Sequence, residues 1–462
     1  MKDMCVSDIL KATGGELLKG ELATIISDIT IDSKSVPSDK TLFIPLKGER
    51  VDAHKFVGSA IENGAIGVII AEESEEYDTA RDILVKSGAE VIIKVVNTKK
   101  ALQDIGAYYR RTRDIKLVGI TGSVGKTTTR EMTATALKPL GKVYQTKGNR
   151  NSQTGVPLTL ADIGDEPVGV IELGMSEAGE IEIISKLSDI DAAIVTNIGV
   201  AHLMQLKTQE NICKEKLSIV KGLKEGGFIF LNGDDSFQRN YSKFIEHKIY
   251  FYGEAEDCDF RILDAVQTES GMNFRLQTPD SAYDITLPVM GMHNVKNAAA
   301  AIGVAIMLGA DSSAVIEEMA SFGGVKMRQQ IIKRNGYTII DDSYNANPDS
   351  MKAGLKVLDK FVCEGRRVAL LADMKELGDD EVKFHNEMGM VVAKLNVDVL
   401  ITVGVLAENI SIKASENNKL ITKHVASNEE ATAFLKEELK SGDVLFVKGS
   451  RSMALDEVIK AL

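Results

Sequence analysis

Cysteine, proline and long apolar runs are scarce in this 462-residue chain, and their scarcity excludes several classes of protein. The four cysteines (Cys5, Cys213, Cys258 and Cys363) are far apart and form no C-x-x-C pair, which argues against a disulfide framework or a structural zinc site. No stretch approaches 18 uninterrupted apolar residues, so we expect no integral membrane segment. The first ten residues carry acidic side chains, unlike a signal peptide. Together these absences predict a cytoplasmic protein.

Basic charge is also in short supply. The 55 lysines and arginines are outnumbered by 67 acidic residues, which gives a formal net charge of -12. This balance argues against a nucleic-acid partner, because such proteins normally carry a basic face. It still allows anionic small molecules, since a few local lysines and backbone amides suffice to bind phosphate.

Apolar runs alternate with helical patterns along most of the chain, which predicts an α/β fold. Eight prolines give no stiff linker, but 462 residues are too many for one core, so several domains are expected. The expected strands of the middle of the chain are Leu117–Ile120, Val168–Leu173, Ala192–Thr196 and Phe228–Leu231. A second series follows Gly323–Gly324, with strands at Thr338–Asp341, Val368–Leu371, Val399–Val403 and Val444–Val447. The alternation predicts largely parallel sheets with helices on both faces, and the second series lacks the G-x-G-x-x-G of a dinucleotide site.

A glycine-rich segment, G-I-T-G-S-V-G-K-T-T-T-R at Gly119–Arg130, follows an apolar strand and precedes a helical pattern. Strand, glycine loop and helix form the context of a P-loop, in which backbone N–H groups face nucleotide phosphates. Lys126 would then reach the β- and γ-phosphates, and the Thr127 hydroxyl would bind Mg²⁺. The strict pattern G-x-x-x-x-G-K-[ST] fails, because Gly119 lies six residues before Gly125. The alternative is a glycine turn that caps an ordinary helix, but the context favours the phosphate site.

Three polar residues after the loop have both a functional and a structural interpretation. Glu172 ends an apolar strand, where it is either a Mg²⁺ ligand facing the P-loop or an outward ion-pair residue. His202 follows the next strand, and a lone histidine is more often structural than a ligand. Lys216 lies in a charged helical segment, Glu210–Val220, and its spacing alone does not distinguish it from a solvated helix face.

The order of these motifs resembles the Mur ligase family, the ATP-dependent amino-acid and peptide ligases of peptidoglycan precursor synthesis. The resemblance is carried by T-G-S-V-G-K-T-T-T, E-L-G-M, T-N-I-G-V-A-H, the lysine that follows, and G-M-H-N-V-K-N-A-A-A-A. The family's own loop, T-G-x-x-G-K-T, accounts for the failed strict pattern. I-I-D-D-S-Y-N-A-N-P-D-S-M (Ile339–Met351), A-D-M-K-E-L-G (Ala372–Gly378) and V-K-G-S-R-S-M (Val447–Met453) are similar to the member that adds D-alanyl-D-alanine. I-D-S-K-S-V-P and V-D-A-H-K-F fit the family's uridine-nucleotide domain, so the resemblance covers essentially the full length.

The resemblance implies three domains and a two-substrate ligase. The domains are an N-terminal UDP-sugar-binding domain (1–98), a central P-loop ATPase domain with a parallel sheet (99–324) and a C-terminal Rossmann-like domain (325–462). The implied substrates are UDP-N-acetylmuramoyl-tripeptide and D-alanyl-D-alanine, joined through an acyl phosphate. The implied cofactors are ATP, two Mg²⁺ ions and a carbamylated lysine. We expect a monomer.

The resemblance also implies a role for individual residues. The implied catalytic residues are Lys126, Glu172, His202 and Lys216, and the implied metal ligands are Thr127, Glu172, His202 and Lys216 as a carbamate. ATP would contact Gly122, Ser123, Val124, Gly125, Lys126, Thr127, Thr128, Asn294, Asn297, Arg328 and Asp342. The UDP group would contact Ser33, Lys34 and His54. Tyr344, Asn345, Ser450 and Arg451 would lie near the incoming dipeptide or the γ-phosphate.

Five positions depart from the family's usual residues, among them Ser152, which stands where the family usually has asparagine. Gln153 and Lys34 replace the usual glutamate and arginine, and Ala53 and Ser218 replace the usual glycine and acidic residue. These departures affect the uridine contacts and the metal shell rather than the reaction class. Two alternatives remain: a Mur-fold amide ligase with a different carboxylate substrate, and a P-loop hydrolase that acts as a switch or motor.

Overall fold

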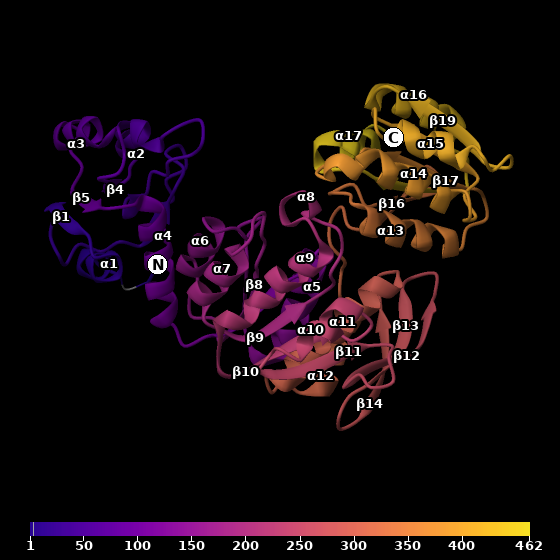
Figure 1. The fold of residues 1–462 in the computed structure, drawn as a ribbon, viewed down its shortest axis with the longest axis horizontal. Coiled ribbons are helices and arrows are strands. Elements are labelled where there is room, and N and C mark those ends of the chain that lie inside the picture. The colour runs from indigo at the N-terminus through magenta and orange to yellow at the C-terminus, as the bar shows by residue number, and fades with distance from the viewer. Residues whose placement is uncertain (3) are drawn as a thin grey trace.

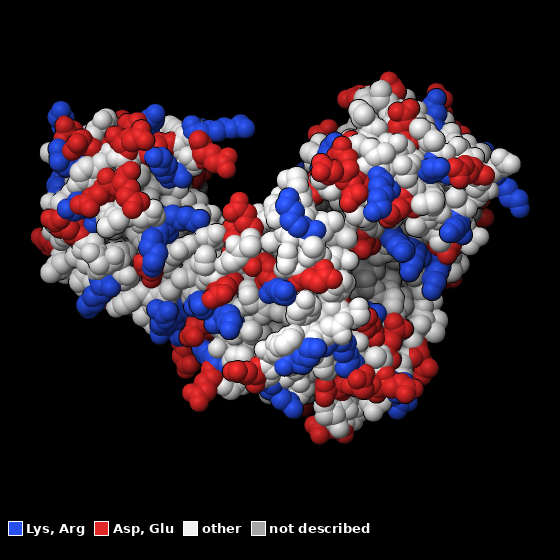
Figure 2. Space-filling view, viewed as in Figure 1, with Lys and Arg blue, Asp and Glu red and all other residues white. Residues whose placement is uncertain are grey.

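Three β-sheets flanked by helices follow one another along the chain in the computed structural model, which describes residues 1–2 and 4–462 (Figure 1). The N-terminal and C-terminal domains lie at opposite ends of the central domain. Acidic and basic side chains are mixed over the visible surface, and a wide hollow separates the two outer domains (Figure 2). The fold therefore confirms the prediction of an α/β protein with three domains.

The N-terminal sheet has five strands in the order β1-β5-β4-β3-β2. Its elements are α1 (Val6–Thr13), β1 (Glu16–Lys19), β2 (Asp28–Thr30), β3 (Thr41–Phe43), α2 (Val57–Glu62), β4 (Gly67–Ala71), α3 (Tyr77–Lys86) and β5 (Val91–Val95). All neighbouring strands are parallel except β1 and β5. The next helix, α4 (Thr98–Arg111), packs on α1 and on the central domain, so one continuous apolar core joins the two domains.

The central sheet has nine strands in the order β14-β13-β12-β11-β10-β9-β6-β8-β7. The strands are β6 (Lys116–Thr121), β7 (Val143–Gln145), β8 (Val168–Glu172), β9 (Ile190–Val195), β10 (Leu223–Asn232), β11 (Lys248–Gly253), β12 (Phe260–Gln267), β13 (Met272–Gln277) and β14 (Ala282–Leu287). Successive strand residues such as Leu117 and Val118 point into two different cores, as expected for a sheet that is covered on both faces.

Each face of the central sheet has its own set of helices. One face carries α6 (Gly155–Ala161), α7 (Glu180–Ser188), α9 (Gln209–Leu217) and α10 (Ser236–Ser242), with the short α8 (Leu203–Leu206) before α9. The other carries α5 (Lys126–Leu137), α11 (Met292–Met307) and α12 (Ser312–Ala320). The predicted parallel sheet with helices on both faces is confirmed for β6 to β11. The antiparallel edge β12–β14 was not predicted, although the alternating buried residues Met272, Phe274 and Leu276 are typical of a half-covered strand.

The C-terminal sheet has six strands in the order β15-β16-β20-β17-β18-β19, parallel except for the first pair. The strands are β15 (Gln330–Arg334), β16 (Tyr337–Asp341), β17 (Arg367–Ala372), β18 (Val399–Val403), β19 (Ile421–Val425) and β20 (Val444–Lys448). The helices are α13 (Pro348–Lys360), α14 (Glu381–Val392), α15 (Glu408–Ala414), α16 (Asn428–Glu438) and α17 (Leu455–Ala461). This is the predicted Rossmann-like arrangement. No helix among the described residues is long and apolar enough to cross a membrane.

Small residues let α11 approach the central sheet closely. Ala298–Ala301 are fully buried, and a Cβ added at Gly303 would lie 2.4 Å from the Phe230 ring on β10. The small side chains of α11 therefore fix this helix close to the sheet. The N-terminal end of the same helix carries the candidate nucleotide-binding residues.

We predict that Gly303→Val destabilises the central domain by about 1–3 kcal/mol, because the new side chain cannot fit against Phe230 without displacing it. Differential scanning calorimetry of the full chain would show a lower Tm. Gly323→Val is the matched control: a Cβ there meets nothing within 4 Å, so its effect should stay within about 0.5 kcal/mol. Equal Tm values for the two variants would contradict the close packing of α11.

Candidate active site

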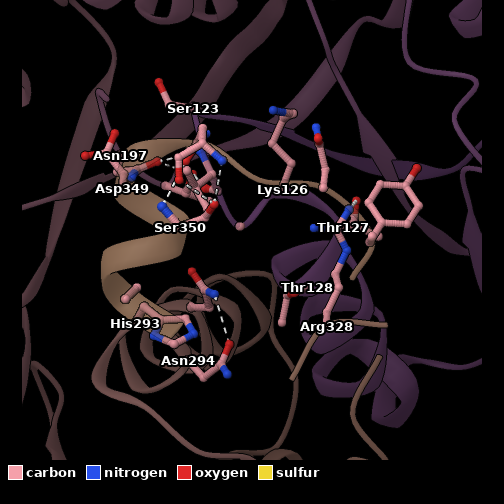
Figure 3. Close-up of a pocket in the computed structure, with 18 of the residues that line it drawn as sticks. Ser123, Lys126, Thr127, Thr128, Asn197, His293, Asn294, Arg328, Asp349 and Ser350 are labelled. Carbon is pink, nitrogen blue, oxygen red and sulfur yellow. Dashed lines mark hydrogen bonds between the residues drawn. The ribbon is translucent and has the colours of Figure 1, made fainter. Parts of the chain in front are cut away.

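A cavity of about 410 Å³ lies between the P-loop and the C-terminal domain (Figure 3). Most of the residues predicted to bind ATP line it. These are Ser123, Val124, Gly125, Lys126, Thr127, Thr128, Asn294, Asn297, Arg328 and Asp342. Glu172, predicted as a metal ligand, and Tyr344 and Asn345, predicted near the dipeptide or the γ-phosphate, line it as well. Segments that are 200 residues apart in the sequence thus meet at one site.

The P-loop backbone requires its glycines. Gly122 has a φ of +150°, and a Cβ there would lie 1.8 Å from Thr196 Oγ1 at the end of β9. Gly125 has a φ of +86°, a left-handed conformation in which only glycine is unstrained. The loop is further fixed by Asn197, whose main-chain and side-chain oxygens accept the N–H groups of Ser123 (3.0 Å) and Val124 (2.9 Å).

The hydroxyl of Thr127 lies between an acidic and a basic side chain. It donates to Glu172 Oε2 (3.0 Å) and accepts from the Arg328 guanidinium (3.1 Å). Glu172 ends β8 and is 4% exposed, and its second oxygen accepts from the Asn151 amide (2.9 Å). Lys126 begins α5, and its ammonium donates to the Gly122 carbonyl (2.7 Å). Burial lowers the pKa of Lys126, and the nearby Glu172 carboxylate partly offsets this effect.

The oxygen donors of this site fit a hard cation. Thr127 and Glu172 offer one hydroxyl and one carboxylate, which are typical Mg²⁺ ligands. Nowhere in the described part of the chain do three His, Cys, Asp or Glu side chains gather into a metal cluster. The remaining ligands would therefore be phosphate oxygens and water, as is usual for Mg²⁺ at a nucleotide site.

His202 and Lys216 are not among the residues that line the cavity. Both are close enough to Lys126 for its charge to lower their pKa values. His202 has a φ of +65° and begins α8. Burial, followed by the charges of Lys216 and Lys126, lowers the pKa of His202 to about 4, so its imidazole is neutral at pH 7. A neutral imidazole is the form that binds metals.

Lys216 is a buried amine without an acidic partner. It lies in α9 with 1% of its surface exposed, and no hydrogen bond or ion pair to its ammonium is found in the described parts of the chain. The neighbouring Glu215 is already occupied by the N–H groups of Gly179 (2.7 Å) and Ile181 (2.9 Å). Burial and the charge of Lys126 lower the pKa of Lys216 well below its ordinary range.

The C-terminal domain contributes a charged pair and an aromatic ring. Lys448 donates to Asp342 Oδ2 (2.7 Å), and burial raises the pKa of Asp342 although Lys448 lies beside it. The Arg328 guanidinium lies 4.3 Å from the centroid of the Tyr344 ring, whose hydroxyl donates to Asn149 of the central domain (2.7 Å). Arg328 and Tyr344 therefore both reach across the domain boundary.

The start of α11 forms the far end of the cavity, where Figure 3 shows His293 and Asn294 opposite Lys126 and Thr127. The Asn294 amide donates to the Met290 carbonyl (2.8 Å). Asn297 lies beneath the P-loop, 3.2 Å from the position that a Cβ on Gly125 would take. Asn294 is thus fixed at the start of α11, and Asn297 lies against the P-loop itself.

The residues predicted for the UDP group are in the N-terminal domain, apart from the cavity. Ser33 is buried and its carbonyl accepts from Asn63, whereas Lys34 is exposed. Both ring nitrogens of His54 are engaged, with Asp52 Oδ1 (2.6 Å) and with the Ala71 N–H (3.0 Å). These two bonds tie the ring to the loop before α2 and to β4, and the expected contact of His54 with the UDP group stays a prediction.

Ser450 and Arg451 likewise lie outside the cavity. The Ser450 hydroxyl accepts the Lys375 N–H (2.9 Å), and Arg451 pairs with Asp456 (2.8 Å). The lining residues that sequence reasoning missed include three asparagines and two lysines: Asn149, Asn151, Asn197, Lys296 and Lys448. Their positions inside already recognised motifs, such as Asn197 in T-N-I-G-V-A-H and Lys448 in V-K-G-S-R, could have identified some of them.

Family models match three consecutive parts of the chain. "Mur ligase family, catalytic domain" matches residues 25–110, "Mur ligase middle domain" matches 120–305, and "Mur ligase, glutamate ligase domain" matches 327–451.

Individual relatives match over nearly the whole length. The chain is 35% identical to the UDP-N-acetylmuramoyl-tripeptide--D-alanyl-D-alanine ligase of Bacillus subtilis, over 97% of this chain and 96% of that protein. A crystal structure of MurF from Acinetobacter baumannii superposes with a TM-score of 0.87 at 29% identity, covering 99% and 98% of the two chains. A MurF ligase from Thermotoga maritima in complex with ADP gives a TM-score of 0.82 at 29% identity over 94% and 96%. With its P-loop, its three domains and these matches, the chain belongs to the Mur ligase family.

Proposed function

We propose that this protein is an ATP-dependent ligase that adds D-alanyl-D-alanine to UDP-N-acetylmuramoyl-tripeptide in peptidoglycan precursor synthesis. The observation that carries the proposal is the cavity in which Thr127 joins the P-loop, Glu172 and Arg328 of the C-terminal domain. The full-length similarity to the B. subtilis ligase supports the choice of substrates. The domain limits that follow are 1–98 for the UDP-sugar domain, 99–324 for the ATPase domain and 325–462 for the dipeptide domain.

A carboxylate reacts poorly with an amine, so the reaction first activates the carboxylate. The tripeptide carboxylate attacks the γ-phosphorus of ATP, the bond to the β–γ bridging oxygen breaks, and ADP leaves. The deprotonated amine of D-alanyl-D-alanine then attacks the acyl carbon, and the bond from that carbon to the phosphate oxygen breaks. The products are an amide and inorganic phosphate. Lys126 and Arg328 supply fixed positive charge where the phosphoryl group moves, which is the main contribution expected of the protein.

The residues assigned to Mg²⁺ fall in two groups. Thr127 and Glu172 would hold the first ion, and His202 with the carbamate of Lys216 the second. When bound, the ions neutralise charge on the phosphate oxygens. Burial, the main cause of the lowered pKa of His202, favours the neutral imidazole that can bind a metal.

The state of Lys216 favours carbamylation. Its lowered pKa increases the fraction of neutral amine, which can attack the carbon of CO₂, form an N–C bond and release a proton. The product is an anion beside Lys126, so the modification replaces a repulsive pair of cations by an attractive pair of opposite charges.

The substrate ends are assigned to the two outer domains. Ser33 and Lys34 face the UDP group, and Tyr344, Asn345, Ser450 and Arg451 lie on the side of the dipeptide.

At Gln153, the side-chain amide donates to Glu180 Oε1 (2.8 Å), a bond that the family's usual glutamate could not donate. The glutamine at this position therefore helps to hold Glu180 in place. We further propose a cytoplasmic monomer.

Phosphate release tests the ligase function. In the presence of ATP and Mg²⁺, we expect release only when UDP-N-acetylmuramoyl-tripeptide and D-alanyl-D-alanine are added together, because the acyl phosphate forms on one substrate and is consumed by the other. Each substrate alone is the control. Equal release without either substrate would support a P-loop hydrolase and refute the ligase.

Removal of the Lys216 amine tests the carbamate. We expect Lys216→Ala to lower kcat by about 10²–10³-fold, the usual cost of losing one preorganised charge, with partial recovery on addition of acetate or formate. Wild-type protein prepared in ¹³C-bicarbonate should show a carbamate carbon resonance that the variant lacks.

The matched control is Lys214→Ala, two residues away on the exposed side of α9, where the ammonium lies over the Tyr241 ring. Its kcat should remain close to that of the wild type. Full activity of Lys216→Ala, or a carbamate signal that persists in it, would rule out the assignment.

A further inference from the structure

One loop of the central domain is bonded in succession to three different parts of the molecule. It follows β9 and comprises Asn197–Val200. The N–H of Ile198 donates to Asp235 Oδ2 at the start of α10 (2.7 Å), and the N–H of Gly199 donates to Ser123 Oγ of the P-loop (2.9 Å).

The third bond of this loop crosses to the C-terminal domain. The N–H of Val200 donates to Asp349 Oδ2 (3.2 Å), where Asp349 is the second residue of α13. Reciprocal bonds between Asn347 and Ser350 cap this helix and fix its first turn, so the carboxylate is held in place. Figure 3 shows Ser123, Asn197 and Asp349 gathered on one side of the cavity.

Asp349 can approach the loop because Gly199 has no side chain. Gly199 is buried, and a Cβ there would lie 2.1 Å from Asp349 Oδ2 and 3.2 Å from Ser123 Cβ. Any other residue at 199 would collide with the carboxylate. Gly199 therefore lets the P-loop and the C-terminal domain meet at one point.

The next residues of the chain are also covered by the C-terminal domain. Val200 and Leu203 pack against its core, and the backbone at Gly378 lies against the Met204 side chain. His202 stands between these contacts with a φ of +65°. A non-glycine residue in this conformation costs free energy and persists only where its surroundings hold it. The surroundings of His202 are in part those of the other domain.

We propose that Asp349 is a positioning residue that couples docking of the C-terminal domain to the placement of His202. The inference rests on the proposed function, in which His202 serves the second Mg²⁺. When the domain is undocked, the Val200 N–H loses its acceptor, and Val200 and Leu203 lose their contacts with the C-terminal core, while Leu203 keeps those with the central core. The segment that holds His202 is then free to relax. His202 is accordingly in position only while Arg328 and the dipeptide domain are also at the site.

Substitution of Asp349 tests the coupling. A hydrogen bond to a charged group is worth about tenfold to a hundredfold in an equilibrium, so we expect Asp349→Ala to lower kcat by that factor while KM for the UDP substrate stays within about twofold. Small-angle X-ray scattering with a non-hydrolysable ATP analogue should give a larger radius of gyration for this variant than for the wild type. Asp349→Asn keeps an oxygen acceptor for Val200 and should restore most of both properties.

Asp359→Ala is the matched control on the same helix, because the hydrogen bonds that Asp359 accepts among the described residues come from Asn396, within the C-terminal domain. It should match the wild type in kcat and in radius. The proposal is overturned if Asp349→Ala also matches the wild type in both, or if Asp359→Ala is equally impaired. If the wild type releases no phosphate with both substrates, the proposed function fails, while the scattering comparison still decides whether Asp349 docks the domain.

A double-mutant cycle tests the direct contact with Gly199. Gly199→Ala alone should lower kcat at least tenfold, because its Cβ occupies the place of Asp349 Oδ2. In the Asp349→Ala background, the same change should cost less than about threefold, since the carboxylate with which it collides is gone. Independent, multiplicative losses would show that the two residues act separately and would refute the coupling.

Discussion

The hydroxyl of Thr127 is the point on which the candidate site depends. It joins the first turn of α5, the carboxylate at the end of β8 and the guanidinium of the C-terminal domain through two hydrogen bonds of 3.0 and 3.1 Å. Because the hydroxyl both donates and accepts, it holds Glu172 and Arg328 near each other without a direct pairing of their charges. A cation and a phosphate can enter between them with little rearrangement, which is the preorganisation that phosphoryl transfer requires.

Local charge at the cavity differs from that of the whole protein. The chain carries a net charge of -12, yet Lys126, Arg328, Lys296 and Lys448 all line this one cavity. Burial lowers the pKa of Lys126 and of Lys448, so these amines hold their protons less firmly than exposed lysines do. Lys448 is paired with Asp342, whereas the ammonium of Lys126 donates to the Gly122 carbonyl, so a polyphosphate would supply an opposite charge to Lys126. The site is therefore built for an anion even though the surface is not.

Sequence reasoning reached the P-loop, the strand-end position of Glu172 and the parallel sheets, because each depends on local periodicity or on fixed motif spacing. Sequence reasoning could not predict contacts between residues that only the tertiary structure brings together. Nothing local distinguishes Asp349 from a first-turn acidic residue of any helix, and its partner Val200 contributes only a backbone N–H. Nor does its motif reveal that both ring nitrogens of His54 bond within its own domain, and its contact with the UDP group stays a prediction.

The two outer domains are attached to the central one by different physical means. One apolar core runs from Ile9 and Ile69 through α4 to the central sheet, so moving the N-terminal domain would expose buried hydrocarbon. The C-terminal domain has two cores, one of which is joined from the central domain by Met290, Val200 and Leu203. Elsewhere it meets the P-loop side through polar contacts of Arg328, Tyr344 and Asp349. Replacing a polar contact by hydrogen bonds to water costs little net free energy, whereas exposing a buried apolar core to water costs much more. We therefore expect the C-terminal domain, rather than the N-terminal one, to open for substrate exchange. The loop before His202 lies at the contact that such an opening would break.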